Sequence, residues 1–118
     1  MPDKNTTVSD LKQKVRAFCE ERDWDQFHDI KELSLALSIE ASELLEHFRW
    51  LKDKEINEKF NKKREEIEDE LADILFFTTR IAQLHNIDLT EVFERKLEKN
   101  NKKYPVSKSK GSNKKYTD

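Results

Sequence analysis

Apolar residues recur along this chain at intervals of three and four positions, the period of one face of an α-helix. Three of these runs follow a residue that can cap a helix, with an acidic residue three positions later. Thr7 precedes Leu11, Val15, Phe18 and Cys19; Asp29 precedes the apolar positions from Leu33 to Phe48; Asp88 precedes Val92, Phe93 and Leu97. The pattern therefore predicts three helices, which begin after residues 7, 29 and 88.

A further helix is predicted for residues 65–84, although no capping pattern marks its start. Residues 52–64 before it are strongly polar and fit a loop, a short helix or both. Residues 102–118 hold six lysines and one aspartate, with almost nothing to bury. We therefore expect one helical domain over residues 1–105 and a lysine-rich disordered tail over residues 106–118.

Composition supports an all-α fold. The chain has 118 residues, 41% of them charged, with one Gly and two Pro. A fold with many turns normally needs more of both residues, so we expect a four-helix bundle. Seven Phe and two Trp are more aromatic residues than a disordered chain of this size carries, so the bundle should have a packed core.

The helix predicted for residues 65–84, the third along the chain, also indicates self-association. Ile74, Leu75, Phe76 and Phe77 are consecutive, and consecutive helical positions point about 100° apart, so their side chains surround the helix. A helix that is apolar on all sides must be covered on all sides. Three short companion helices are too few for this, and we expect a homo-oligomer, at least a dimer.

Other features exclude several protein classes. No apolar run approaches the roughly 18 residues of a membrane span, and the N-terminus lacks the apolar segment of a secretion signal, so we expect a soluble, cytoplasmic protein. The single cysteine, Cys19, excludes an intramolecular disulfide and a paired-cysteine zinc site. A net charge of −2 gives no general reason to bind nucleic acid.

Acidic residues three positions apart, which share one helix face, are the main candidate for chemistry. Two such pairs lie among apolar residues of their helices: Glu40 with Glu43, and Glu70 with Asp73. Carboxylates that face a core are costly unless a cation compensates them, and we find no Lys or Arg on these stripes. An all-oxygen ligand set suits Mg²⁺ or Mn²⁺. The alternative is that the pairs belong to solvated faces, as acidic pairs usually do in a highly charged chain.

Two further groups are candidates for ligand binding. Trp24 and His28 precede the second predicted helix and Trp50 follows it, so the two indoles could form a slot for a flat base; the alternative is that they pack on the ends of the bundle. At the end of the last helix, cations and a phenol recur at spacings of three to four: Lys96, Asn100, Lys103 and Tyr104. They fit phosphate binding or ordinary compensation of the helix dipole.

Four stretches together resemble the MazG-like all-α nucleoside triphosphate pyrophosphohydrolases, most of all the dCTP pyrophosphatase branch. They are ERDWDQFH (21–28), LALSIEASELLEHFRW (35–50), EIEDELADILFF (66–77) and KLEKNNKKYP (96–105). The resemblance covers about residues 8–105. It implies Mg²⁺-dependent hydrolysis of a (deoxy)nucleoside triphosphate, with dCTP as a candidate, to the monophosphate and pyrophosphate, by a dimer or tetramer.

The resemblance also implies roles for individual residues. The metal ligands would be Glu40, Glu43, Glu70 and Asp73, with Glu43 as our choice for the catalytic base. Trp24, His28 and Trp50 would line the base pocket, and Lys96, Asn100, Lys103 and Tyr104 would bind the phosphates or the sugar. Similar proteins often have Tyr where Phe77 stands, so Phe77 would line the pocket without a phenol hydroxyl.

A second class of function stays open beside the enzyme, namely a non-catalytic helical interaction module whose lysine-rich tail contacts nucleic acid. The tail has few aromatic residues between its lysines, so nucleic acid is not the partner we expect. Stabilisation by Mg²⁺ would favour the enzyme, whereas a response to salt alone would favour the interaction module.

Overall fold

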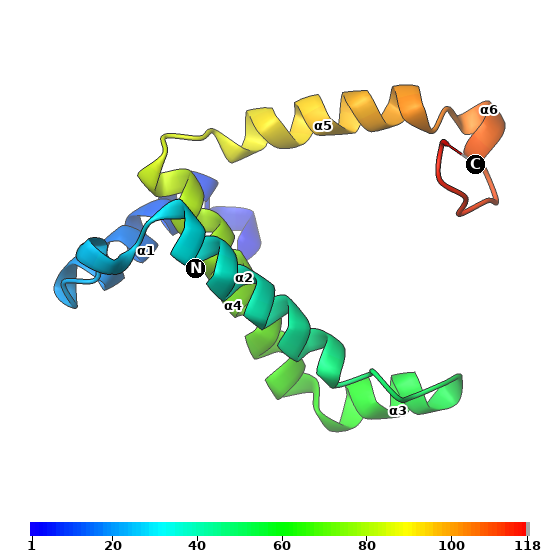
Figure 1. Cartoon of the computed structure of the whole chain (residues 1–118), viewed down its shortest axis with the longest axis horizontal. Coiled ribbons are helices and arrows are strands. Elements are labelled where there is room, and N and C mark those ends of the chain that lie inside the picture. Colours follow the sequence, from blue (N-terminus) through cyan, green and yellow to red (C-terminus); the bar gives the residue numbers. More distant parts are fainter. Residues whose placement is uncertain (118) are drawn as a thin grey trace. The chain divides into compact units, whose positions relative to one another are not determined.

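The structure is a computed structural model in which residues 1–117 are described. Every regular element in this range is helical (Figure 1): α1 (Val8–Glu21), α2 (Ile30–Glu46), α3 (Lys54–Lys62), α4 (Arg64–Leu84), α5 (Leu89–Lys103), α6 (Val106–Ser109) and the 3₁₀ turns η1 (Asp3–Asn5) and η2 (Asp25–Phe27). The expected all-α fold class is confirmed. Among the helices of residues 1–117, none has the length and apolar character needed to cross a bilayer.

Capping side chains fix the starts of three helices, as the sequence predicts. At α1, Thr7 Oγ1 accepts a hydrogen bond from the Asp10 amide (3.1 Å), and the Asp10 carboxylate accepts one from the Thr7 amide (2.9 Å). At α2, the Asp29 carboxylate caps the amide of Glu32 (2.7 Å). At α5, the Asp88 carboxylate caps the amide of Glu91 (3.0 Å). Each cap satisfies an amide that has no partner within its helix.

The polar stretch 52–64 contains both a turn and a short helix. Asp53 has a positive φ of 54° and provides no side-chain cap for α3. Lys63 alone separates the end of α3 from the start of α4. The sequence left both possibilities open, and this segment realises both.

The chain forms two compact units, and the first comprises Met1–Asn86. Within it, α1, α2 and α3 each make their principal helix–helix contacts with α4. Its buried apolar residues come from three helices: Val15 and Cys19 from α1, Leu33 from α2, and Ile67 and Ala82 from α4. Helix α4 is therefore the centre of this unit, and residues placed on it lie close to both α1 and α2.

The second unit begins at Ile87 and contains α5 and α6. The domain boundary that we expected after residue 105 lies inside this unit. Where the sequence predicts a disordered tail, the structure describes the four-residue helix α6 and a contact between the rings of Tyr104 and Tyr116, with centroids 5.8 Å apart. None of residues 106–117 is buried, so this segment adds no core.

Candidate active site

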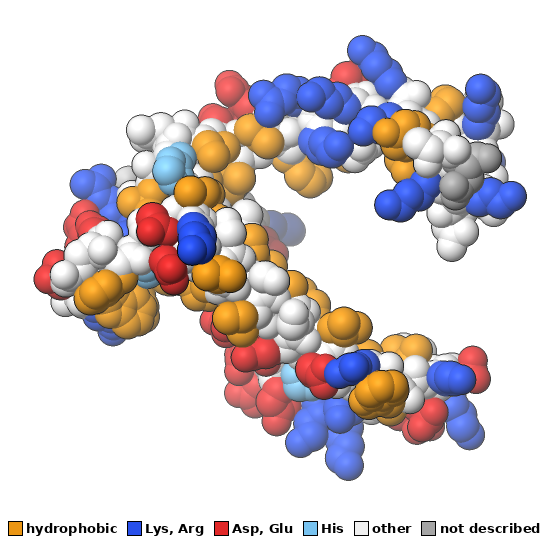
Figure 2. Space-filling view, in the orientation of Figure 1, with side chains coloured by type: hydrophobic (Ala, Val, Ile, Leu, Met, Phe, Trp, Pro, Cys, Tyr) orange, Lys and Arg blue, Asp and Glu red, His pale blue; other side chains and the backbone are white. Residues whose placement is uncertain are grey.

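A cluster of carboxylates lies between α2 and α4. Glu40 and Glu43 are one turn apart on α2, and Glu70 projects from α4. Each offers a carboxylate oxygen, and these oxygens all lie within 4.8 Å of one another. Figure 2 shows acidic side chains gathered over the α2–α4 pair on the part that leads to α3. The packing of the two helices thus brings together three of the four metal ligands predicted from the sequence.

Two oxygens of this cluster lack the partners that buried polar atoms normally have. Glu40 Oε2 and Glu70 Oε2 are buried, and neither makes a hydrogen bond within residues 1–117. Unpartnered buried carboxylate oxygens are costly, and they are rare in folded proteins unless an ion or a water molecule completes them. Carboxylate oxygens are the ligands that a hard divalent cation such as Mg²⁺ prefers, so these side chains fit a metal centre.

The cluster changes the acidity of its most enclosed member. Burial raises the pKa of Glu40 to about 7, with further contributions from a hydrogen bond with Glu43, the charges of Asp73 and Glu43, and a hydrogen bond with Glu70. Asp73, the fourth predicted ligand, is exposed and lies outside the group of three, but its charge acts on Glu40. Without a cation, a proton on Glu40 reduces the repulsion between the negative charges of the cluster.

The sequence interpretation assigned no partner to His47, and the structure places it beside the cluster. Its Nε2 atom is 3.8 Å from Glu70 Oε1, and both side chains are largely buried. A protonated His47 would form an ion pair with Glu70. His47 is the residue after the last turn of α2, and no local pattern links it to a carboxylate on another helix.

Arg80 is a second residue that the sequence interpretation missed. We found no Arg or Lys on the acidic stripes, yet Arg80 follows Asp73 by seven residues and so lies on the same face of α4. It is fully buried and forms a salt bridge with Asp25. Its other hydrogen bonds go to His28 and Gln83. None goes to the carboxylate cluster, so the guanidinium of Arg80 does not compensate the charge of the cluster.

Aromatic rings form a continuous series beside Arg80. Phe77 contacts Phe76 (centroids 5.2 Å apart), Phe76 contacts Phe18 (5.6 Å), and Phe18 contacts Trp24 (5.6 Å). Trp24 in turn contacts His28, with ring centroids 6.1 Å apart. Three predicted pocket residues, Trp24, His28 and Phe77, therefore belong to one aromatic cluster built from α1, the η2 turn and α4.

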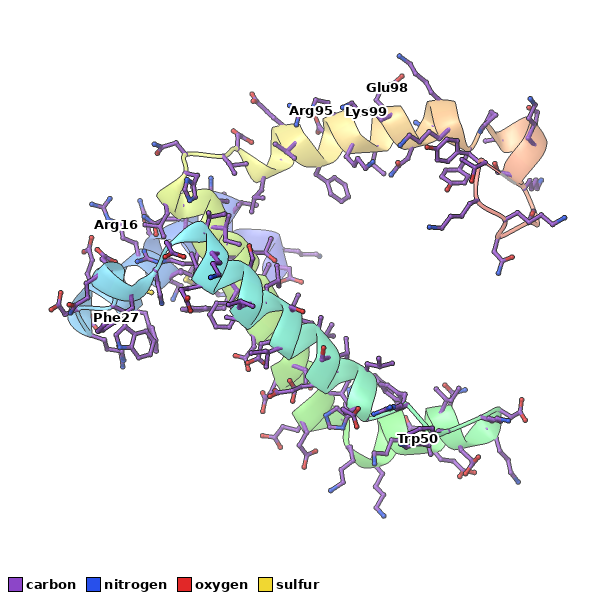
Figure 3. The ribbon with its side chains drawn as sticks, viewed as in Figure 1. Arg16, Phe27, Trp50, Arg95, Glu98 and Lys99 are labelled. Carbon is purple, nitrogen blue, oxygen red and sulfur yellow. The ribbon has the colours of Figure 1, made fainter. Side chains whose placement is uncertain are left out.

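Trp50 is far from this cluster within the same chain. Trp24 precedes α2 and Trp50 follows it, and the 17 residues of α2 span about 25 Å. Figure 3 shows Trp50 beyond one end of α2, while Phe27 of the η2 turn lies beyond the other. Trp50 is 78% exposed, and the Arg49 guanidinium lies 4.5 Å from the centroid of its ring. Within one chain, the two indoles cannot enclose the same base.

The predicted phosphate-binding residues lie in the second unit, at the C-terminal end of α5. Lys96, Asn100 and Lys103 recur at spacings of four and three, so they share one helix face. Tyr104 ends the helix, and its amide donates to the Asn100 carbonyl (2.8 Å). Figure 2 shows Lys and Arg side chains along α5 and around α6. Two of the three residues on this face are lysines, and their binding to phosphate stays a prediction.

One cavity of the first unit contains none of the predicted site residues. It has a volume of about 240 Å³ and lies between α1 and the end of α4, with Ser9, Gln13 and Gln83 in its wall. The candidate chemistry lies elsewhere, at the carboxylate cluster on α2 and α4.

Comparisons with known proteins agree with this geometry. Residues 35–118 match the MazG-like family, and this range includes both acidic pairs. The dCTP pyrophosphatase 1 of Mus musculus is 38% identical over 114 residues, 95% of this chain and 67% of that protein. The human dCTP pyrophosphatase 1 is 34% identical over the same length, with the same coverage.

A solved structure shares the fold as well. The crystal structure of a pyrophosphatase from Archaeoglobus fulgidus superimposes with a TM-score of 0.80 at 33% identity, covering 89% of this chain and 98% of that one. The resemblance first noted in four stretches of sequence thus extends over nearly the whole chain. The chain belongs to the MazG-like family.

Proposed function

We propose that this protein is a Mg²⁺-dependent nucleoside triphosphate pyrophosphohydrolase that converts a (deoxy)nucleoside triphosphate, with dCTP as the leading candidate, to the monophosphate and pyrophosphate. The observation that carries the proposal is the cluster of Glu40, Glu43 and Glu70, two of whose buried oxygens have no partner. Similarity to dCTP pyrophosphatase 1 of mouse, cattle, rat and humans supports the choice of substrate.

In this proposal the metal ligands are Glu40, Glu43 and Glu70, joined by Asp73 from the next turn of α4. Mn²⁺ would fit the same oxygen ligands as Mg²⁺. When bound, the cation supplies the positive charge that a site built of carboxylates otherwise lacks and that a triphosphate requires. The four acidic side chains hold that charge between α2 and α4.

Glu43 is our candidate for the catalytic base. It is the exposed member of the cluster, so water reaches its carboxylate, whereas Glu40 and Glu70 turn one oxygen each into the interior. Hydrolysis adds one water across a P–O–P bond and releases one proton. A carboxylate beside the attacking water accepts that proton, and the carboxylate loses it again to solvent.

We further propose that the active protein is a homodimer or homotetramer. Apolar side chains recur at four-residue spacing on exposed faces of both site helices: Leu35 (49% exposed) and Ile39 (56%) on α2, and Leu71 (52%) and Leu75 (50%) on α4. A second copy would cover these faces. It would also offer a route for Trp50 to reach a base bound near Trp24, which a single chain does not provide.

A panel of canonical and modified nucleoside triphosphates, with pyrophosphate release measured in the presence and absence of Mg²⁺, tests the function. We expect pyrophosphate rather than phosphate as the product, with dCTP among the best substrates. No release from any nucleotide would contradict the proposal. Light scattering across a micromolar dilution series tests the assembly, and a fully active monomer throughout would contradict the oligomer.

A further inference from the structure

The buried guanidinium of Arg80 is tied to the histidine of the aromatic cluster. Its Nε atom is 3.0 Å from His28 Nδ1, its two terminal nitrogens bond to Asp25 and Gln83, and the side chain has no exposed surface. Asp25 belongs to the η2 turn, and His28 directly follows that turn. One side chain of α4 thereby anchors both ends of the turn that carries part of the proposed base pocket.

The contact with His28 determines where the imidazole carries its proton. A guanidinium has only donors and does not lose its proton in proteins, so His28 Nδ1 must accept through its lone pair. A neutral imidazole has one N–H, which is then on Nε2. That nitrogen makes no hydrogen bond within residues 1–117, and it is not among the buried polar atoms without a partner. Its N–H is therefore open to an incoming ligand.

We propose that Arg80 is a positioning residue that holds His28 as a neutral ring with its proton on Nε2, so that the pocket offers a hydrogen-bond donor to an acceptor atom on the edge of a nucleobase. A ring nitrogen with a lone pair and a carbonyl oxygen are the acceptors of this kind on a pyrimidine. The role in base recognition rests on the proposed function, whereas the position of the proton does not.

The electrostatic surroundings of His28 agree with a neutral ring. Burial lowers the pKa of His28, and the charge of Arg80 lowers it further, while Asp25 acts in the opposite direction. Trp24 packs on one side of the imidazole, with the ring centroids 6.1 Å apart. Trp24 thus holds the position of the ring, and Arg80 determines which of its nitrogens carries the proton.

Long-range ¹H–¹⁵N spectra of the full chain at neutral pH test the proposal, because they distinguish a protonated ring nitrogen from one with a lone pair. A His28→Gln variant assigns the His28 signals against those of His47 and His85. We expect the wild-type ring to carry its proton on Nε2. Arg80→Met, which keeps the length of the side chain without its donors, should give a mixture of both tautomers. Arg80→Lys should restore the wild-type form in part, and Asp25→Asn should leave it unchanged.

Steady-state kinetics with dCTP as the probe test the consequence for binding. Arg80→Met should raise KM by about three- to tenfold, the worth of one hydrogen bond, with little change in kcat. Loss of kcat at an unchanged KM would overturn the recognition role. A wild-type proton on Nδ1, or on both nitrogens, would overturn the proposal outright. The spectrum of the wild-type protein therefore tests the proposal even if Arg80→Met does not fold. A wild type that hydrolyses no nucleotide would contradict the proposed function, and the spectrum of His28 would still decide the role of Arg80.

Discussion

Glu40 on α2 and Glu70 on α4 present carboxylate oxygens within 4.8 Å of each other, and the Oε2 atom of each is buried without a hydrogen-bond partner among the described residues. Two acids from separate helices are rarely held together in this way without compensation, because like charges repel and both lose hydration. The arrangement destabilises the metal-free protein and favours a bound cation. It yields a test of function and a test of stability.

The first prediction concerns catalysis. Replacing Glu40 or Glu70 with Gln removes a negative ligand, and metal ions contribute several kcal/mol to such reactions, so pyrophosphate release should fall by about a hundredfold or more. The helical circular dichroism should stay intact. Glu65→Gln, at an exposed position of α4, is the matched control and should retain activity. Near-normal Mg²⁺-dependent turnover in both variants would refute the metal assignment.

The second prediction concerns stability and pH in the absence of metal. The pKa of Glu40 is about 7 in the folded protein and near 4.5 in an unfolded chain, so the folded state binds the extra proton between these values. The stabilising contribution is complete below pH 4.5 and is lost as the pH rises through 7. The melting temperature should therefore fall over this range by more in the wild type than in Glu40→Gln.

Mg²⁺ is the complementary measurement for the same site. Added Mg²⁺ should raise the melting temperature of the wild type at pH 8, where Glu40 is ionised, since a ligand that binds only the folded state stabilises it. The Glu40→Gln variant should gain less. An equal gain in both proteins, or an equal gain from the same ionic strength of NaCl, would speak against a specific cation site.

The third prediction separates the two tryptophans. Trp24 packs against Phe18 and His28, so Trp24→Ala should lower both the stability and the affinity for nucleotide. Trp50 is largely exposed, so Trp50→Ala should leave the stability of the first unit within about 0.5 kcal/mol. If Trp50 stacks on the base, its loss should weaken binding by about 1–3 kcal/mol. Unchanged affinity in Trp50→Ala would exclude that residue from the pocket.

The fourth prediction concerns the lysine-rich segment. None of the deleted residues that the structure describes, 107–117, is buried. Deletion after Val106 should therefore change the free energy of unfolding by less than about 0.5 kcal/mol and kcat/KM by less than about twofold, as for other surface alterations. The deletion also removes Tyr116, whose ring contacts Tyr104 and has the Lys103 ammonium 5.0 Å from its centroid. A large loss of activity would show that these contacts matter for substrate binding.

Local rules predicted the helices well because each helix start depends on residues three positions apart. The caps join Thr7 to Asp10, Asp29 to Glu32 and Asp88 to Glu91, so each can be recognised from the local sequence alone. The start of α3 was not predictable in this way, because it follows the left-handed residue Asp53 without a side-chain cap. The acidic pairs could be predicted for the same reason, because the two members of each pair are three positions apart in the sequence.

Contacts between distant residues were not predictable from these rules. Arg80 and Asp25 are 55 positions apart, and His47 meets Glu70 across two helices. No periodicity within a single helix connects such residues. The separation of the two tryptophans within one chain was predictable, because the 17 residues of α2 lie between them. Their shared role in base binding stays a prediction.

The central position of α4 has a consequence for how the protein is made. Helices α1, α2 and α3 all precede α4 in the chain, yet each makes its principal helix–helix contacts with it. During synthesis, these three segments emerge from the ribosome before the surface on which they pack exists, and isolated helices of this length are marginal in water. The first unit should therefore assemble in one late, cooperative event after α4 has emerged. Until then its apolar side chains are available to chaperones, so a slow stretch of translation before α4 should lower the yield of folded protein.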